Sequence, residues 1–179
     1  EIYLPYRRSL KIVEVGVDSN AEFGNSATYA RPPLVLYGSS VAQGVGAVRP
    51  GMSYLAILAR SLGMDFVNLG FGGAGKAEPE VVELISQVET SVIFLDLGKS
   101  YGTQTEEVFD EMLLKMRSRH PQVPKVCMTP IYSSREMCEP EYAALSRHTR
   151  KVMCGATEKR ISGGDANLIL VDGLELLGQ

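Results

Sequence analysis

The stretch PLVLYGSSVAQG, residues 33–44, decides the fold because it joins a short apolar run to a polar turn bounded by glycines. An apolar run of this length without alternation is typical of a strand buried on both faces of a parallel sheet. Polar residues follow at once, so we expect the chain to leave the sheet at Gly38. The sequence therefore predicts a buried strand at 33–37 and, directly after it, a loop that is a candidate for chemistry.

Four similar apolar runs follow, separated by segments in which apolar residues recur at helical spacing. The runs are DFVNL (65–69), SVIFLDL (91–97), PKVCM (124–128) and NLILV (167–171). The intervening helix faces contain Leu55, Leu58 and Leu62, then Val81, Leu84, Ile85 and Val88, then Val108, Phe109, Met112 and Met116, and finally a helix opened by Pro140. Short strands that alternate with helices predict βαβ units and a three-layer α/β domain with a parallel sheet of about five strands.

The N-terminal part differs in composition from this alternation. The segment LKIVEVGV, residues 10–17, is rich in β-branched residues and predicts a strand, whereas residues 18–32 are rich in Ser, Asn, Gly and Pro and predict a linker. We therefore expect a β segment and linker over residues 1–30 and the α/β domain over residues 31–179.

Composition restricts the classes of partner. The 179 residues include 18 Lys plus Arg and 21 Asp plus Glu, for a formal net charge of −3, and 45% are hydrophobic, as in a globular domain. A mildly acidic chain without a basic stripe is not expected to bind nucleic acid. No apolar run approaches the roughly 20 residues that span a bilayer. We expect no metal or other cofactor, because the acidic residues do not converge with His or Cys, and small molecules or proteins remain as partners.

The loop after the second run, GFGGAGK at residues 70–76, matches two phosphate-binding patterns. Gly70, Gly72 and Gly75 spell GxGxxG, and the same letters also spell GxxxxGK. Two features oppose a nucleotide site. Ala77 offers no hydroxyl to Mg²⁺, and Glu78 and Glu80 would place negative charge at the helix start that a phosphate needs. A P-loop or Rossmann-type nucleotide binder through Gly70–Lys76 is the minor alternative.

The first loop offers a nucleophile. A serine among small residues in a tight strand-to-helix turn is exposed at the sheet edge, where Ser40 lies. Main-chain N–H groups at Ser40 and in the 70–75 turn would face the same volume, as an oxyanion hole requires. Taken alone, a serine at this place is also typical of a helix cap.

Residues 37–85, from YGSSVAQG through NLGFGGAGK to VVELI, resemble the GDSL-type, or SGNH, hydrolases, especially the subgroup whose first block reads YGSS. The resemblance implies a flavodoxin-like, doubly wound sheet and an acyl-enzyme mechanism on small carboxylic esters. Ser40 would be the nucleophile, and its N–H and that of Gly73 would donate to the oxyanion. It also implies that residues 1–17 are the end of an N-terminal β-sandwich.

Two departures from the family pattern matter. Ser100, in LDLGKSYG, stands where the family has an Asn that donates to the oxyanion hole. The family's final DxxH block, which supplies the base and its acid, has no counterpart: residues 172–175 read DGLE, and the two histidines, His120 and His148, lie in helical segments. The α/β domain is therefore expected to be incomplete at its C-terminus.

Two hypotheses stay open at this point. In the first, the base lies beyond Gln179 and the domain is an ester hydrolase or acyltransferase; Arg49 and Tyr54 then line the pocket, and Gln43, Lys76 and Lys99 border the cleft. In the second, the domain is catalytically silent and binds protein partners within a larger assembly.

Overall fold

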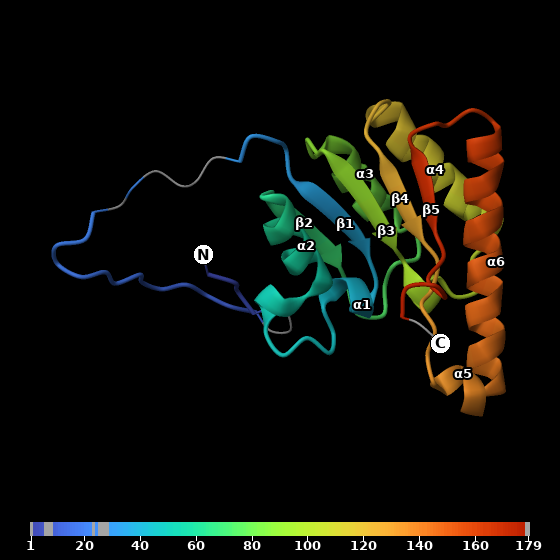
Figure 1. The fold of residues 1–179 in the computed structure, drawn as a ribbon, viewed down its shortest axis with the longest axis horizontal. Helices are drawn as coiled ribbons and strands as arrows, with labels where there is room; N and C mark the ends of the chain where they lie inside the picture. The colour runs from blue at the N-terminus through green and yellow to red at the C-terminus, as the bar shows by residue number, and fades with distance from the viewer. Residues whose placement is uncertain (1, 6–8, 23, 25–28, 178–179) are drawn as a thin grey trace.

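A five-stranded parallel sheet forms the centre of the molecule in the computed structural model, which describes residues 2–5, 9–22, 24 and 29–177 (Figure 1). The strands are β1 (Leu34–Gly38), β2 (Phe66–Gly70), β3 (Val92–Asp96), β4 (Lys125–Met128) and β5 (Leu168–Val171). Their order across the sheet is β2-β1-β3-β4-β5, and every neighbouring pair is parallel. The predicted α/β fold with a doubly wound, flavodoxin-like sheet of five strands is confirmed.

The helices occupy the segments between the strands. They are α1 (Ser40–Gln43), the 3₁₀ helix η1 (Pro50–Met52), α2 (Tyr54–Leu62), α3 (Pro79–Gln87), the 3₁₀ helix η2 (Gly98–Tyr101), α4 (Glu106–Arg119), α5 (Arg135–Cys138) and α6 (Pro140–Ser162). Proline stands at the start of α3 and α6, where its missing N–H has no partner to lose. Because α3 ends at Gln87, the predicted helical position Val88 lies just outside it.

Helices cover the two faces of the sheet unequally. On one face, Val35, Tyr37, Ile93 and Leu95 pack against buried residues of α3, α4 and α6 in the larger core cluster. On the other face, Leu34 and Leu36 pack against Ala42 of α1 and against Leu55 and Ala59 of α2. Figure 1 shows α6 as a long helix along the β4–β5 side and α2 beside the β2–β1 side.

Burial on the α2 side decreases across the sheet. Leu36, Phe94, Val126 and Ile169 occupy one row of the register and therefore point to the same face. Leu36 is fully buried beneath α2, Phe94 and Val126 are half-buried, and Ile169 at the sheet edge is 48% exposed. Within the described part of the chain, α2 thus covers the β2–β1 half of this face and leaves β5 open to solvent.

The predicted N-terminal strand is wrong. Residues 9–22 contain no strand, and their apolar side chains are exposed, with Val13 at 85%. A strand exists only through hydrogen bonds to a neighbouring strand, and none of the described residues pairs with this segment. A β-branched composition alone is therefore not enough to form a strand here. Residues 9–22 extend away from the sheet in Figure 1.

We predict that two isoleucines on nearby strands respond very differently to truncation. Ile93→Ala removes a fully buried side chain and should lower the free energy of unfolding by about 2–5 kcal/mol. Ile169→Ala, the matched control, should cost about 1 kcal/mol or less because water already reaches that side chain. Urea denaturation followed by circular dichroism measures both, and equal losses would contradict the uneven coverage.

Candidate active site

Three loops meet at the carboxyl edge of the sheet, where β1, β2 and β3 end. The N–H of Ser39 donates to the carbonyl of Asp96 over 3.1 Å, and the N–H of Phe71 donates to the carbonyl of Gly38 over 3.0 Å. The backbones touch: a Cβ atom built on Gly70 would lie only 2.2 Å from the main-chain nitrogen of Gln43. A glycine is therefore required where the second loop passes over the first.

Ser40 is the first residue of α1, and Ser39 precedes it at the N-cap position. Ser40 is half-buried, whereas Gly72 and Gly73 of the second loop are exposed. The side chain of Gln43 joins the two loops, because its Oε1 accepts the N–H of Gly72 over 3.0 Å. A Cβ atom built on Gly72 would lie 4.0 Å from that of Ser40. Ser40 and the GFGG turn, which includes Gly73 with φ = +81°, are thus neighbours.

The third loop approaches the first through Gly98. A Cβ atom built on Gly98 would lie 2.9 Å from Oγ of Ser39. Ser100 follows two residues later in η2 and is half-buried. Lys99, between them, places its Nζ atom 3.4 Å from the ring centre of Tyr142 on α6. Partial burial and then the charge of Arg135 lower the pKa of the Lys99 ammonium. This ammonium is therefore directed toward α6.

Glu78 holds the second loop closed. Its carboxylate accepts the N–H groups of Gly75 over 3.2 Å and of Lys76 over 2.9 Å, and it also accepts the hydroxyl of Tyr37. Partial burial opposes ionisation of Glu78, but these hydrogen bonds, led by that of Tyr37, lower its pKa overall. A carboxylate thus occupies the amides that a phosphate would need, which argues against the nucleotide alternative on physical grounds.

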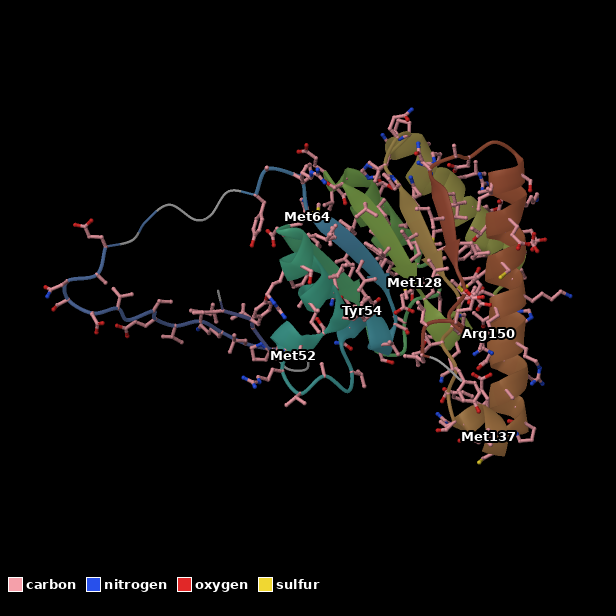
Figure 2. The ribbon with its side chains drawn as sticks, viewed as in Figure 1. Met52, Tyr54, Met64, Met128, Met137 and Arg150 are labelled. Atoms are coloured by element: carbon pink, nitrogen blue, oxygen red, sulfur yellow. The ribbon has the colours of Figure 1, made fainter. Side chains whose placement is uncertain are left out.

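A second acidic group is buried directly beneath the first loop. Asp96 is only 5% exposed, and its Oδ2 accepts the hydroxyl of Tyr54 over 2.9 Å. Tyr54 is the first residue of α2 and is labelled in Figure 2. Burial raises the pKa of Asp96, and the hydrogen bond from Tyr54 partly offsets that rise. Burial and the charge of Asp96 raise the pKa of Tyr54, so the phenol keeps its proton.

Sequence analysis missed both of these hydrogen-bonded pairs. Tyr54 was expected to line the pocket, yet its hydroxyl bonds to the buried Asp96. Arg49 lines a different cavity of about 530 Å³, together with residues of η1. A clue to the Tyr54–Asp96 pair existed, because an aspartate at the end of a fully apolar strand needs a partner when buried.

The two histidines bond to main-chain carbonyls of helical segments and their connections. Nε2 of His120 lies 3.0 Å from the carbonyl oxygen of Ile85, and Nε2 of His148 lies 3.1 Å from that of Gln104. Asp172, in the DGLE segment, accepts the hydroxyl of Thr129 over 3.1 Å and the N–H of Leu174 over 3.0 Å. Asp172 therefore fastens the turn after β5 to the end of β4.

Over the described ranges, no three His, Cys, Asp or Glu side chains gather closely enough to hold a metal ion. The helices in those same ranges include none with the length and apolar character needed to cross a membrane.

The chain belongs to the GDSL-like lipase/acylhydrolase family, because the sequence profile of that family matches residues 31–179. A search of curated protein sequences finds no match.

Solved structures show the same fold. A GDSL-like lipase from Bacteroides ovatus is 26% identical, with a TM-score of 0.78 over 91% of this chain and 49% of its own. A salicylyl-acyltransferase from a tetracycline biosynthetic pathway is 25% identical, with a TM-score of 0.74 over 84% of this chain and 44% of its own. A family 3 carbohydrate esterase from Clostridium thermocellum, at 17% identity and a TM-score of 0.61 over 83% of this chain and 81% of its own, shares the fold. The chain spans about half the length of the first two.

We predict that the carboxylate of Glu78 stabilises the domain. Glu78→Ala leaves the amides of Gly75 and Lys76 without their acceptor and should lower the free energy of unfolding by about 1–3 kcal/mol at pH 7. Because the folded-state pKa of Glu78 is lowered, this contribution is present above the unfolded-state pKa and is lost as the pH falls through the folded value. Glu80→Ala, two residues away and exposed in the first turn of α3, is the control and should cost about 1 kcal/mol or less, the contribution of a charge at a helix N-terminus.

We predict a pH-dependent cost for removing the Tyr54 hydroxyl. The raised pKa of Asp96 means that its effect on stability is most favourable below its unfolded-state pKa and is lost as the pH rises through the folded value. Tyr54→Phe takes away the donor that offsets this loss, so the variant should be destabilised by about 1–3 kcal/mol at pH 8 and by less at pH 4.5. Thermal unfolding of both chains at the two pH values tests this, and a cost independent of pH would contradict it.

Proposed function

We propose that this domain cleaves carboxylic esters of small acyl groups, with Ser40 as the nucleophile. The observation that supports this most strongly is the position of Ser40 at the start of α1, against the GFGG turn at the carboxyl edge of the sheet. Open α/β sheets bind ligands at this edge. Family membership supports an acylhydrolase. The three neighbours reported above are named as a lipase, an acyltransferase and an esterase, and each of these names denotes an enzyme that acts on acyl groups.

In the proposed reaction, Oγ of Ser40 attacks the ester carbonyl carbon and the carbonyl oxygen becomes an oxyanion. The N–H groups of Ser40 and Gly73 donate to that oxygen, and the hydroxyl of Ser100 adds one weaker donor from η2. Collapse of the tetrahedral intermediate breaks the bond to the alcohol and leaves an acyl group on Ser40. Water then releases the acid, or an acceptor hydroxyl takes the acyl group.

The reaction also needs a base to take the Ser40 proton. Neither His120 nor His148 is assigned this role, because each ring bonds to a main-chain carbonyl of a helix or its connection. The DxxH block implied by the family resemblance would supply the base and its orienting acid.

A second candidate function is an inert, partner-binding domain. Ser100 in place of the family's amide and the positions of the two histidines favour it. The two candidates differ in whether Ser40 reacts.

We predict that a fluorophosphonate probe labels Ser40 and that Ser40→Ala abolishes both the labelling and hydrolysis of p-nitrophenyl acetate. Loss of the nucleophile should lower the rate by at least about 10³-fold. Ser118→Ala, which removes an exposed hydroxyl from α4, is the matched control and should leave both unchanged. Intact mass and peptide mapping locate the adduct. A complete absence of labelling would favour the inert candidate.

A further inference from the structure

A cavity of about 520 Å³ lies between the second loop and residues 2–4. Its lining residues include Gln43 and Phe71, which lie close to Ser40 in sequence or in the neighbouring turn, and the aromatic rings of Tyr3 and Phe66. Ser40 and Gln43 are three positions apart on α1 and therefore share one face of that helix. Gln43 bonds to Gly72 of the second loop and also lines the cavity. The cavity therefore lies next to the residues that surround the proposed nucleophile.

Residues 2–4 are held in place by Tyr3. The Tyr3 ring stacks on Phe66, with ring centres 6.4 Å apart and planes inclined by 20°. The guanidinium of Arg60 lies 5.4 Å from the Tyr3 ring centre and donates to its hydroxyl over 2.7 Å. A Cβ atom built on Gly51 would lie 2.8 Å from the same ring. Contacts on three sides thus fix Tyr3 as a wall of the cavity.

The polar groups in the walls are engaged by the protein itself. Asn68 donates from Nδ2 to the carbonyl of Ala42 over 3.0 Å and accepts the N–H of Gly70 at Oδ1 over 2.8 Å. Oδ1 of Asp65 accepts the N–H of Phe66 over 2.8 Å. A ligand that depends on many hydrogen bonds therefore finds few partners here, and Asp65, the one charged side chain among the described residues that line the cavity, disfavours anions.

The cavity also offers aromatic surface. Phe71, between two glycines of the proposed oxyanion turn, is 42% exposed, and Phe66 and Tyr3 form a stacked pair in the cavity wall. Aromatic rings prefer offset-stacked or edge-to-face partners, and an exposed phenylalanine in the wall can serve as one.

We propose that this cavity is a subsite for an uncharged aromatic ring carried by the ester that Ser40 cleaves. The subsite rests on the function proposed above for its link to catalysis. Phe71 is the specificity-determining residue, and residues 2–4 form part of the wall.

Binding to the Ser40→Ala chain tests the subsite without turnover. Benzyl acetate should bind about 2- to 12-fold more tightly than cyclohexylmethyl acetate, which has a saturated ring on the same scaffold, as judged by NMR titration. Adding Phe71→Ala or Phe71→Leu should abolish the preference, because neither side chain has an aromatic face. Val48→Ala, at an apolar side chain that is 90% exposed and lies outside the cavity, should keep it.

Equal binding of the two esters, or a preference that survives both Phe71 variants, would overturn the subsite. The outcome is independent of catalysis. Ring preference without fluorophosphonate labelling would remove the proposed esterase but leave an aromatic subsite, whereas labelling without ring preference would remove the subsite alone.

Discussion

The close approach of main chains at the carboxyl ends of β1, β2 and β3 is the constraint on which the site depends. Gly38 lies so close to β3 that an added Cβ would fall 2.0 Å from the carbonyl oxygen of Asp96, and a Cβ added to Gly70 would fall 2.2 Å from the main-chain nitrogen of Gln43. Side chains larger than hydrogen at these two positions would push the loops apart. The placement of Ser40 against the GFGG turn therefore follows from how tightly the sheet packs at this edge.

Two acidic residues then fix the loops before any substrate arrives. Glu78 bonds to the amides that close the second loop, and Asp96, paired with Tyr54, lies beneath the first. Both carboxyl groups accept hydrogen bonds from other groups of the protein. An oxyanion hole works because its donors are already oriented when charge develops, so in the proposed reaction these two residues would act by stiffening the turns, without touching the substrate. Because the carboxylate of Glu78 already accepts the amides of Gly75 and Lys76, the glycine-rich loop is poorly suited to bind phosphate, although its sequence matches phosphate-binding patterns.

Much of the fold follows from the sequence, because each strand is an apolar run and each helix has a regular apolar face. The five strands lie within one residue of their predicted positions, from Leu34–Gly38 to Leu168–Val171. The N-terminal strand failed because pairing depends on a partner that local composition does not reveal. For the same reason the Tyr54–Asp96 and Tyr37–Glu78 pairs were missed: their members are about 40 residues apart, and only the folded sheet brings them together. The roles of Ser40, Gly73 and Ser100 remain predictions from the family resemblance.

The central claim is that Oγ of Ser40 and the N–H of Gly73 face a common point. A crystal structure of the protein after reaction with a fluorophosphonate measures this most directly. The account predicts a phosphonyl group bonded to Ser40, with its oxygen about 2.7–3.1 Å from the main-chain nitrogens of Ser40 and Gly73. A phosphonyl oxygen turned away from the GFGG turn, or an adduct on another residue, would contradict it.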